Sequence, residues 1–118
     1  PLGGYLIAAM KAYDDPISFS GAFNFGPEKR DHLTVSELAQ IAIESWGSGQ
    51  WKEMNDEHQQ PHEAGLLKLD ITKSSKKLGW HPRLNSRQAI EWTMEWYRQP
   101  VRQRLAITMG QIKKYGEL

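Results

Sequence analysis

The chain has 118 residues, a formal net charge of +1 and no cysteine. The lack of cysteine excludes disulfide bonds, thiolate catalysis and cysteine-ligated zinc, and the near-neutral charge provides no long-range attraction to nucleic acid or to a membrane surface. No apolar run approaches the roughly 20 residues that cross a bilayer, and no signal peptide is visible, so the predicted location is the cytoplasm. The length suits one domain with a modest core.

The first predicted element is a helix from Leu2 to Tyr13, because its apolar residues recur at helical spacing. The sequence "DDP" ends this helix, since Pro16 cannot continue the hydrogen-bond ladder. Residues 17–27, "ISFSGAFNFGP", place Phe23 and Phe25 on one face and predict a strand.

The segment "LTVSELAQIAIESWG" predicts the clearest helix. Thr34 and Glu37 have the spacing of a capping box, and Gly47 supplies the C-terminal stop. The predicted apolar stripe of this helix comprises Val35, Leu38, Ala39, Ala42, Ile43 and Trp46. A short strand is predicted at "QWKEMN" (50–55), and the polar stretch that follows is predicted to be a loop.

The stretch "GLLKLD" (65–70) predicts a short extended segment, after which Asp70 or Thr72 caps the short helix "KSSKKL". Gly79 then lets the chain reverse, and Trp80 is expected to fold back onto the core.

Two further helices complete the chain. Asn85 and Gln88 repeat the capping spacing and begin a helix that Pro100 ends, and a last helix is predicted over residues 101–115. The pattern therefore predicts about five helical segments and two or three short strands, with no βαβ run long enough for a parallel sheet of its own.

The histidines suggest one possible metal site. His58 and His62 have the i, i+4 spacing that binds zinc on a helix, with Glu63 beside them, but Pro61 interrupts such a helix. A solvated or ligand-facing loop is therefore preferred over a metal site. His32 and His81 are predicted to be surface residues.

The loop "GPEKRDH" (26–32) delivers Lys29 and Arg30 between a predicted strand and a helix N-terminus. Such an arrangement can hold a phosphate or a sugar hydroxyl, and the alternative is a solvated connector.

Two other patterns have a structural and a nucleic-acid interpretation. Trp46, Trp80, Trp92 and Trp96 lie in amphipathic patterns or at a helix stop, which favours core packing over a base-stacking platform. The basic run "KSSKK" is short and lies in a nearly neutral chain, so a solvated helix face is preferred over a nucleic-acid site.

Several of these motifs occur together in one known family. In this order, "FNFGP", "LTVSELA", "LKLDITKSSKKLGWHPRL" and "AIEWTMEWY" resemble the C-terminal part of the extended short-chain dehydrogenases that modify nucleotide sugars. Within that family, "PLGGYL", "FNFGP" and "PHEAGLLKLD" are most similar to the branch that converts CDP-glucose to CDP-4-dehydro-6-deoxy-glucose. The resemblance covers about residues 1–99, and residues 101–118 match nothing in the family.

The resemblance implies a fold class and a domain. The expected class is α/β, or α+β as an isolated lobe: a mainly helical small lobe with two or three short strands, the C-terminal substrate-binding lobe of an extended Rossmann-type enzyme. Residues 1–118 would form this single domain. Because the chain opens without Met inside a helical pattern, we expect it to be a piece of a longer protein, without the N-terminal NAD-binding Rossmann domain.

The resemblance also implies a reaction. In the family, a bound NAD takes hydride from sugar C4, water is lost across C5 and C6, and the hydride returns to C6. This chain contains no G-x-G-x-x-G and no Tyr-x-x-x-Lys. We therefore expect it to have no catalytic residue, no cofactor and no metal of its own, and to be inactive alone, whereas the parent enzyme would use NAD.

Four substrate-binding residues follow from the resemblance. Relatives hold the nucleotide and diphosphate in the loop after "FNFG" and in the segment before "LKLD", which here supply Lys29, Arg30, His62 and Glu63. The relatives that act on dTDP-glucose carry arginines before the matching strand, where this chain has Gly65. This difference favours another base, and it also removes a phosphate ligand.

The expected partner is a nucleotide sugar, CDP-glucose, held together with the missing domain, and not nucleic acid or a membrane. The parent enzyme can be a homo-oligomer. Two alternatives stay open: the lobe of another nucleotide-sugar epimerase or dehydratase, and a free-standing helical interaction module.

Overall fold

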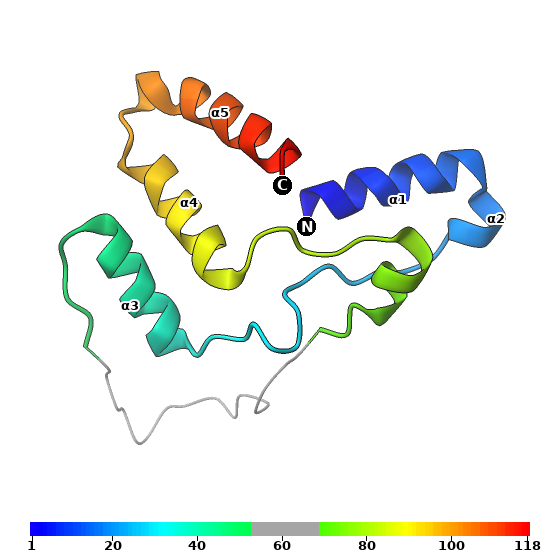
Figure 1. Cartoon of the computed structure of the whole chain (residues 1–118), viewed down its shortest axis with the longest axis horizontal. Helices are drawn as coiled ribbons and strands as arrows, with labels where there is room; N and C mark the ends of the chain where they lie inside the picture. The colour runs from blue at the N-terminus through cyan, green and yellow to red at the C-terminus, as the bar shows by residue number, and fades with distance from the viewer. Residues whose placement is uncertain (53–68) are drawn as a thin grey trace. The chain divides into compact units, whose positions relative to one another are not determined.

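A computed structural model describes residues 1–52 and 69–118. Within them the chain forms five α-helices and two short helical turns (Figure 1), namely α1 (Leu2–Asp14), α2 (Pro16–Phe19), α3 (Val35–Trp46), the π-helical turn η1 (Ser74–Leu78), α4 (Ser86–Arg98), the 3-10 turn η2 (Val101–Gln103) and α5 (Arg104–Gly116). The chain divides into two compact units. In their described parts, the first unit comprises residues 1–32 and 69–82, and the second unit comprises residues 33–52 and 83–118.

The predicted α/β class is wrong, because the described residues are helical or irregular and include no β-strand. The first part of the strand predicted at 17–27 is instead the short helix α2. Asp15 caps it, with its carboxylate accepting from the Ser18 amide at 3.0 Å, and Pro16 occupies the first helical position. An Asp followed by Pro is a strong helix-start signal, and here it prevails over the alternating pattern.

The rest of that predicted strand does not pair with another strand. A strand needs a partner whose backbone donates to its carbonyls. Here the donors are side chains: Lys73 Nζ donates to the carbonyl of Ala22 at 2.8 Å, and the Ser74 hydroxyl donates to the carbonyl of Asn24.

A short strand is also predicted at 50–55 and a short extended segment at 65–70. Their described ends, residues 50–52 and 69–70, form no strand, and the remainder of both segments lies outside the described residues.

Both predicted capping boxes are confirmed. At α3, the Thr34 amide donates to Glu37 Oε2 at 2.7 Å, and the Glu37 amide donates to Thr34 Oγ1 at 3.2 Å. At α4, the Asn85 amide donates to Gln88 Oε1 at 3.0 Å, and the Gln88 amide donates to Asn85 Oδ1 at 2.8 Å. In each box two backbone amides donate to the side-chain oxygens of two residues that lie three positions apart in the sequence, so local chemistry alone sets both helix starts.

The basic helical turn ends in the reversal that the sequence predicts. The predicted cap at Asp70 or Thr72 is wrong for η1, because the residue before this turn is Lys73 and it makes no side-chain cap hydrogen bond. The Asp70 carboxylate instead accepts from the Thr72 amide at 2.8 Å, ahead of the turn. At the other end, Gly79 has a positive φ of 67° and its amide donates to the carbonyl of Ser75. The Trp80 amide then donates to the carbonyl of Ser74 at 3.3 Å, which turns the Trp80 side chain back over η1.

An aromatic cluster forms the core of the first unit. Trp80 is 4% exposed, as predicted, and its ring meets the Phe25 ring edge to face with 5.1 Å between centroids. Phe25 makes the same kind of contact with Tyr5 of α1, again at 5.1 Å. The buried Gly4 lets α1 approach the Phe25 ring closely, because a side chain at this position would overlap it.

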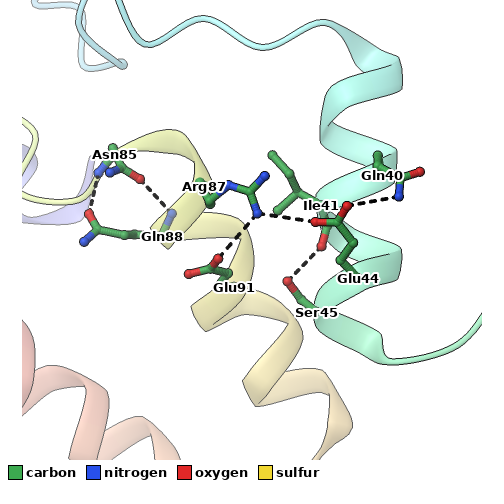
Figure 2. Close-up of polar contacts among 8 residues, drawn as sticks. All are labelled: Gln40, Ile41, Glu44, Ser45, Asn85, Arg87, Gln88 and Glu91. Carbon is green, nitrogen blue, oxygen red and sulfur yellow. Dashed lines mark hydrogen bonds and ion pairs between the residues drawn. The ribbon is translucent and has the colours of Figure 1, made fainter.

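In the second unit, α3 packs against α4 through a residue outside the predicted stripe. Ile41 is the buried residue of α3, and Figure 2 shows its side chain directed toward α4. Val35, Leu38 and Trp46, which the pattern predicts to face the core, are exposed, Trp46 at 44%. The packed face of α3 is therefore rotated from the predicted one.

The helices α1 and α5 turn apolar residues to the solvent. On α1 these are Leu2, Leu6, Met10 and Tyr13; on α5 and the turn before it they are Val101, Leu105, Met109 and Ile112.

The contact of α5 with α4 is polar. Trp96 Nε1 donates to Thr108 Oγ1 at 2.9 Å, and the Arg104 guanidinium lies 4.4 Å over the Trp96 ring. Indole rings attract cations in this geometry, which explains how a polar face can pack here.

Among the described residues, no helix combines the length and the apolar character needed to cross a bilayer.

The burial of Trp80 predicts a large loss of stability when its side chain is truncated. We expect Trp80→Ala to lower the free energy of unfolding by about 3–5 kcal/mol, the usual cost of deleting a buried aromatic side chain. The control is Trp46→Ala, which should cost clearly less than Trp80→Ala because 44% of Trp46 is already exposed to solvent. Urea denaturation followed by circular dichroism measures both, and equal losses would contradict the assignment of Trp80 to the core.

Two glycine-to-alanine substitutions should have opposite effects. A Cβ at Gly4 would overlap the Phe25 ring, so Gly4→Ala should destabilise the chain by about 1–2 kcal/mol despite the better helix propensity of alanine. A Cβ at Gly110 in α5 would meet open space, so Gly110→Ala should stabilise by up to about 1 kcal/mol. Thermal denaturation of both variants measures these effects. If Gly4→Ala raised the melting temperature as Gly110→Ala is expected to do, the close approach of α1 to the Phe25 ring would be refuted.

Candidate functional site

The two predicted diphosphate ligands lie together on a turn in the first unit. The Asp31 amide donates to the carbonyl of Glu28 at 2.9 Å and closes the turn, which carries Lys29 and Arg30 at its tip. Both cations are exposed, and Arg30 Nε pairs with Glu28 Oε2 at 3.2 Å. Because the Arg30 side chain is 88% exposed, this pair is weak and can exchange for another anion. We call residues 28–31 the cationic turn.

The chain leading into the cationic turn is anchored on residues 70–74. The Asn24 side-chain amide donates to the carbonyl of Asp70 at 3.2 Å, and the Asn24 carbonyl accepts from the hydroxyl of Ser74. Ser74 is fully buried, so this second bond is shielded from water. One residue further on, Phe25 enters the aromatic cluster against Trp80.

Asp70 lies at the centre of this arrangement. Its hydrogen bonds from the Thr72 side chain and amide lower the pKa of the carboxyl, and the charges of Lys29 and Lys76 lower the pKa further. Asp70 is exposed, so these charges act through solvent and are screened by salt. The carboxylate therefore stays ionised at neutral pH and offsets part of the positive charge around the cationic turn.

Two ring nitrogens of the first unit are buried without a hydrogen-bond partner among the described residues: His32 Nε2 and Trp80 Nε1. His32, predicted to be a surface residue, is partly exposed, with its Nε2 on the covered side of the ring. His81 is exposed, as predicted, and its Nε2 lies 3.0 Å from the hydroxyl of Ser75.

The second unit contains an open groove of about 460 Å³ that the sequence analysis did not anticipate. Its lining residues come from α3, α4 and α5 and are mostly charged: Glu44, Ser45, Arg87, Glu91, Trp92, Glu95 and Lys114.

The charges in this groove are largely paired with one another. Figure 2 shows Arg87 between two carboxylates, 3.4 Å from Glu44 Oε2 and 3.8 Å from Glu91 Oε1. The Lys114 ammonium lies 4.9 Å over the Trp92 ring. Hydrogen bonds from Gln40 and from Arg87 lower the pKa of Glu44, which keeps its carboxylate ionised within this network. We therefore interpret the groove as a packing seam between helices rather than as a ligand site.

Lys29 and Arg30, adjacent in the sequence, share the tip of the cationic turn, whereas His62 and Glu63 lie outside the described residues. The role of all four in substrate binding stays a prediction. The possible zinc ligands His58 and His62 lie there too. Within residues 1–52 and 69–118, no group of three or more histidine or acidic side chains could hold a metal ion.

The sequence did not indicate two interactions near the cationic turn: the hydrogen bond from the Asn24 side chain to the Asp70 carbonyl, and the effect of the Lys29 charge on the Asp70 carboxylate. One signal was present: Asn24 is a polar residue between two phenylalanines, in a segment that was otherwise expected to bury its side chains.

The chain is similar to part of a characterised enzyme. It is 35% identical over 103 residues to the CDP-glucose 4,6-dehydratase of Salmonella typhimurium, a match that covers 86% of this chain. The chain spans only 28% of the length of that curated relative. No family model matches the chain, and no solved structure matches it. The comparison therefore supports a distant homology to a segment of a nucleotide-sugar dehydratase.

The lowered pKa of Asp70 predicts a contribution to acid sensitivity. The unfolded chain binds the proton at a higher pH than the folded chain, so the stabilisation from Asp70 is complete above its ordinary pKa of about 3.9 and is lost as the pH falls through the lowered value. We expect Asp70→Asn to lower stability slightly at pH 7, because the charge-assisted hydrogen bonds from Thr72 become neutral ones, and to flatten the loss of stability as the pH falls below the ordinary carboxyl pKa. Denaturation midpoints across this range measure the effect, and an unaltered acid limb would contradict it.

Proposed function

We propose that this chain is the nucleotide-sugar-binding part of a CDP-glucose 4,6-dehydratase and that it is catalytically incomplete by itself. The observation that carries the proposal is the 35% identity over 103 residues to the Salmonella typhimurium enzyme of that name. The exposed pair of cations, held on a turn that is anchored to the core of the first unit, supports a role in binding a diphosphate.

In this proposal no residue of this chain takes part in the hydride transfer. The sequence contains no glycine-rich pyrophosphate turn and no Tyr-x-x-x-Lys pair, so it does not fit an NAD site by itself. The NAD of the parent enzyme would supply the hydride transfer, and this chain would bind and orient the nucleotide.

We assign the cationic turn to the diphosphate. Lys29 acts as a point charge, and the Arg30 guanidinium carries further N–H donors besides the Nε that pairs with Glu28. His62 and Glu63 are assigned to the base or ribose on the basis of sequence alone, since both can hydrogen-bond a nucleoside.

The binding that these residues provide should be weak. The cationic turn is solvent-exposed, and its ion pair lies in water rather than in an enclosed cleft. Polar contacts that stay wet lose much of their energy, so we expect a millimolar dissociation constant for CDP.

A titration of the isotope-labelled chain with CDP tests the proposal. We expect the amide resonances of residues 28–32 to shift first, because the diphosphate would approach these cations. Shifts confined to α4 would show that the wrong surface has been assigned.

Charge removal gives a sharper form of this titration. Lys29→Met should weaken CDP binding about three- to tenfold through loss of a charge-assisted contact. The matched control is Lys77→Met, which removes another exposed lysine of the first unit outside the cationic turn and should leave the affinity within about twofold. Equal effects of both substitutions would indicate a general electrostatic attraction and not a site.

The purified 118-residue chain should neither bind NAD nor convert CDP-glucose. An assay for the 4-keto product, with and without added NAD, checks this. Turnover above background would contradict the proposal that the chain is only the binding part of the enzyme.

The remaining alternatives make different predictions for the same titration. The corresponding part of another nucleotide-sugar epimerase or dehydratase would respond more strongly to UDP or dTDP than to CDP. A free-standing helical interaction module would respond to none of the three nucleotides.

A further inference from the structure

Asn24 contacts residues 70–74 through both its side chain and its main chain. Its Nδ2 donates to the carbonyl of Asp70 at 3.2 Å, and its own carbonyl accepts from Ser74. The Asn24 side chain is exposed, so it contributes little buried area. The effect of this side chain must therefore lie in the hydrogen bond itself, which joins two segments that are distant in the sequence.

The chain on both sides of Asn24 follows the same segment. Lys73 Nζ donates to the carbonyl of Ala22 and lies 4.6 Å over the ring of Phe23. A Cβ placed on Gly26 would lie 3.2 Å from a methyl group of Leu69, so the Leu69 side chain packs directly on the Gly26 backbone. These contacts take the place of a β-ladder, and each depends on a single side chain.

The cationic turn begins two residues after Gly26, and Asp70 connects it to Asn24. The carbonyl of Asp70 accepts from the Asn24 amide, while the carboxylate of Asp70 interacts with the charge of Lys29. The separation between Lys29 and Asp70 decides how much of the lysine charge is available to another anion. The hydrogen bond from the Asn24 side chain to the Asp70 carbonyl restrains the main chain of Asp70. It therefore also restrains the separation between the Asp70 carboxylate and Lys29.

We propose that Asn24 is a positioning residue, whose hydrogen bond to the Asp70 carbonyl holds the cationic turn so that Lys29 and Arg30 can meet the diphosphate of a bound nucleotide. This inference rests on the proposed function. Asn24 itself does not touch the ligand; it acts through the two cations.

The variant Asn24→Ala tests this inference with little risk of unfolding. It removes the exposed amide but keeps the Asn24 main-chain bond from Ser74 and the contact between Phe25 and Trp80. We expect lower ¹⁵N heteronuclear NOE values for the amides of residues 28–31 and CDP binding about fivefold weaker than in the wild type, the effect of one exposed hydrogen bond.

The matched control is Gln40→Ala in the second unit. This substitution also removes an exposed amide with one hydrogen bond, which Gln40 Nε2 donates to Glu44 Oε1 at 3.0 Å. It should change neither the NOE values of the cationic turn nor the affinity for CDP.

A double-mutant cycle separates positioning from a general structural role. In a Lys29→Met background, Asn24→Ala should weaken CDP binding by less than about twofold, because part of the charge that Asn24 positions is gone. An equal fold-loss in both backgrounds would overturn the inference, since a purely structural effect does not depend on Lys29.

The outcomes also distinguish this inference from the proposed function. If the wild-type chain binds CDP at the cationic turn but Asn24→Ala changes neither turn mobility nor affinity, the inference fails and the proposed function stands. If CDP shifts no amide of the wild-type chain, both fail, because there is then no diphosphate to position.

Discussion

The edge-to-face contact between Phe25 and Trp80 is the interaction on which the first unit depends. It joins the segment after α2 to the segment after η1, and it gives α1 a surface to pack on through Tyr5 and Gly4. Gly79 reverses the chain directly before Trp80, and side-chain donors from the distant residues Lys73 and Ser74 hold the backbone before Phe25. The aromatic pair then contributes both buried area and a preferred orientation.

The second unit is organised differently, by polar contacts around a small apolar centre. Ile41 is buried between α3 and α4, and the ion pairs of Arg87 and the hydrogen bond from Arg98 to the carbonyl of Ser45 lie at the edges of this contact. Exposed ion pairs contribute little to stability, so the register of the two helices depends mainly on the packing of Ile41 and on the capping boxes that set where each helix begins. The exposed apolar side chains of α1 and α5 are not part of the core of either unit within the described residues.

The candidate site combines an exposed charge with a rigid anchor, which is what weak but oriented anion binding requires. Lys29 and Arg30 stay solvated, so little desolvation opposes an incoming phosphate. Asp70, ionised at neutral pH, offsets some of the Lys29 charge. The similarity to a CDP-glucose 4,6-dehydratase gives this arrangement a specific ligand class to be tested against.

The sequence by itself determined the features whose physics is local. Both capping boxes, the stop at Gly47 and the reversal at Gly79 follow from residues a few positions apart, and all are found in the structure. Only the tertiary structure decided what the alternating segment 17–27 became, because a strand exists only when another strand donates to it, and here Lys73 and Ser74 supply donors from far along the chain. The same holds for Ile41, which periodicity could not select because several faces of α3 carry apolar residues and the position of α4 chooses among them. It holds as well for Asn24 and Asp70, since nothing in their local sequence shows that they would meet and flank the cationic turn.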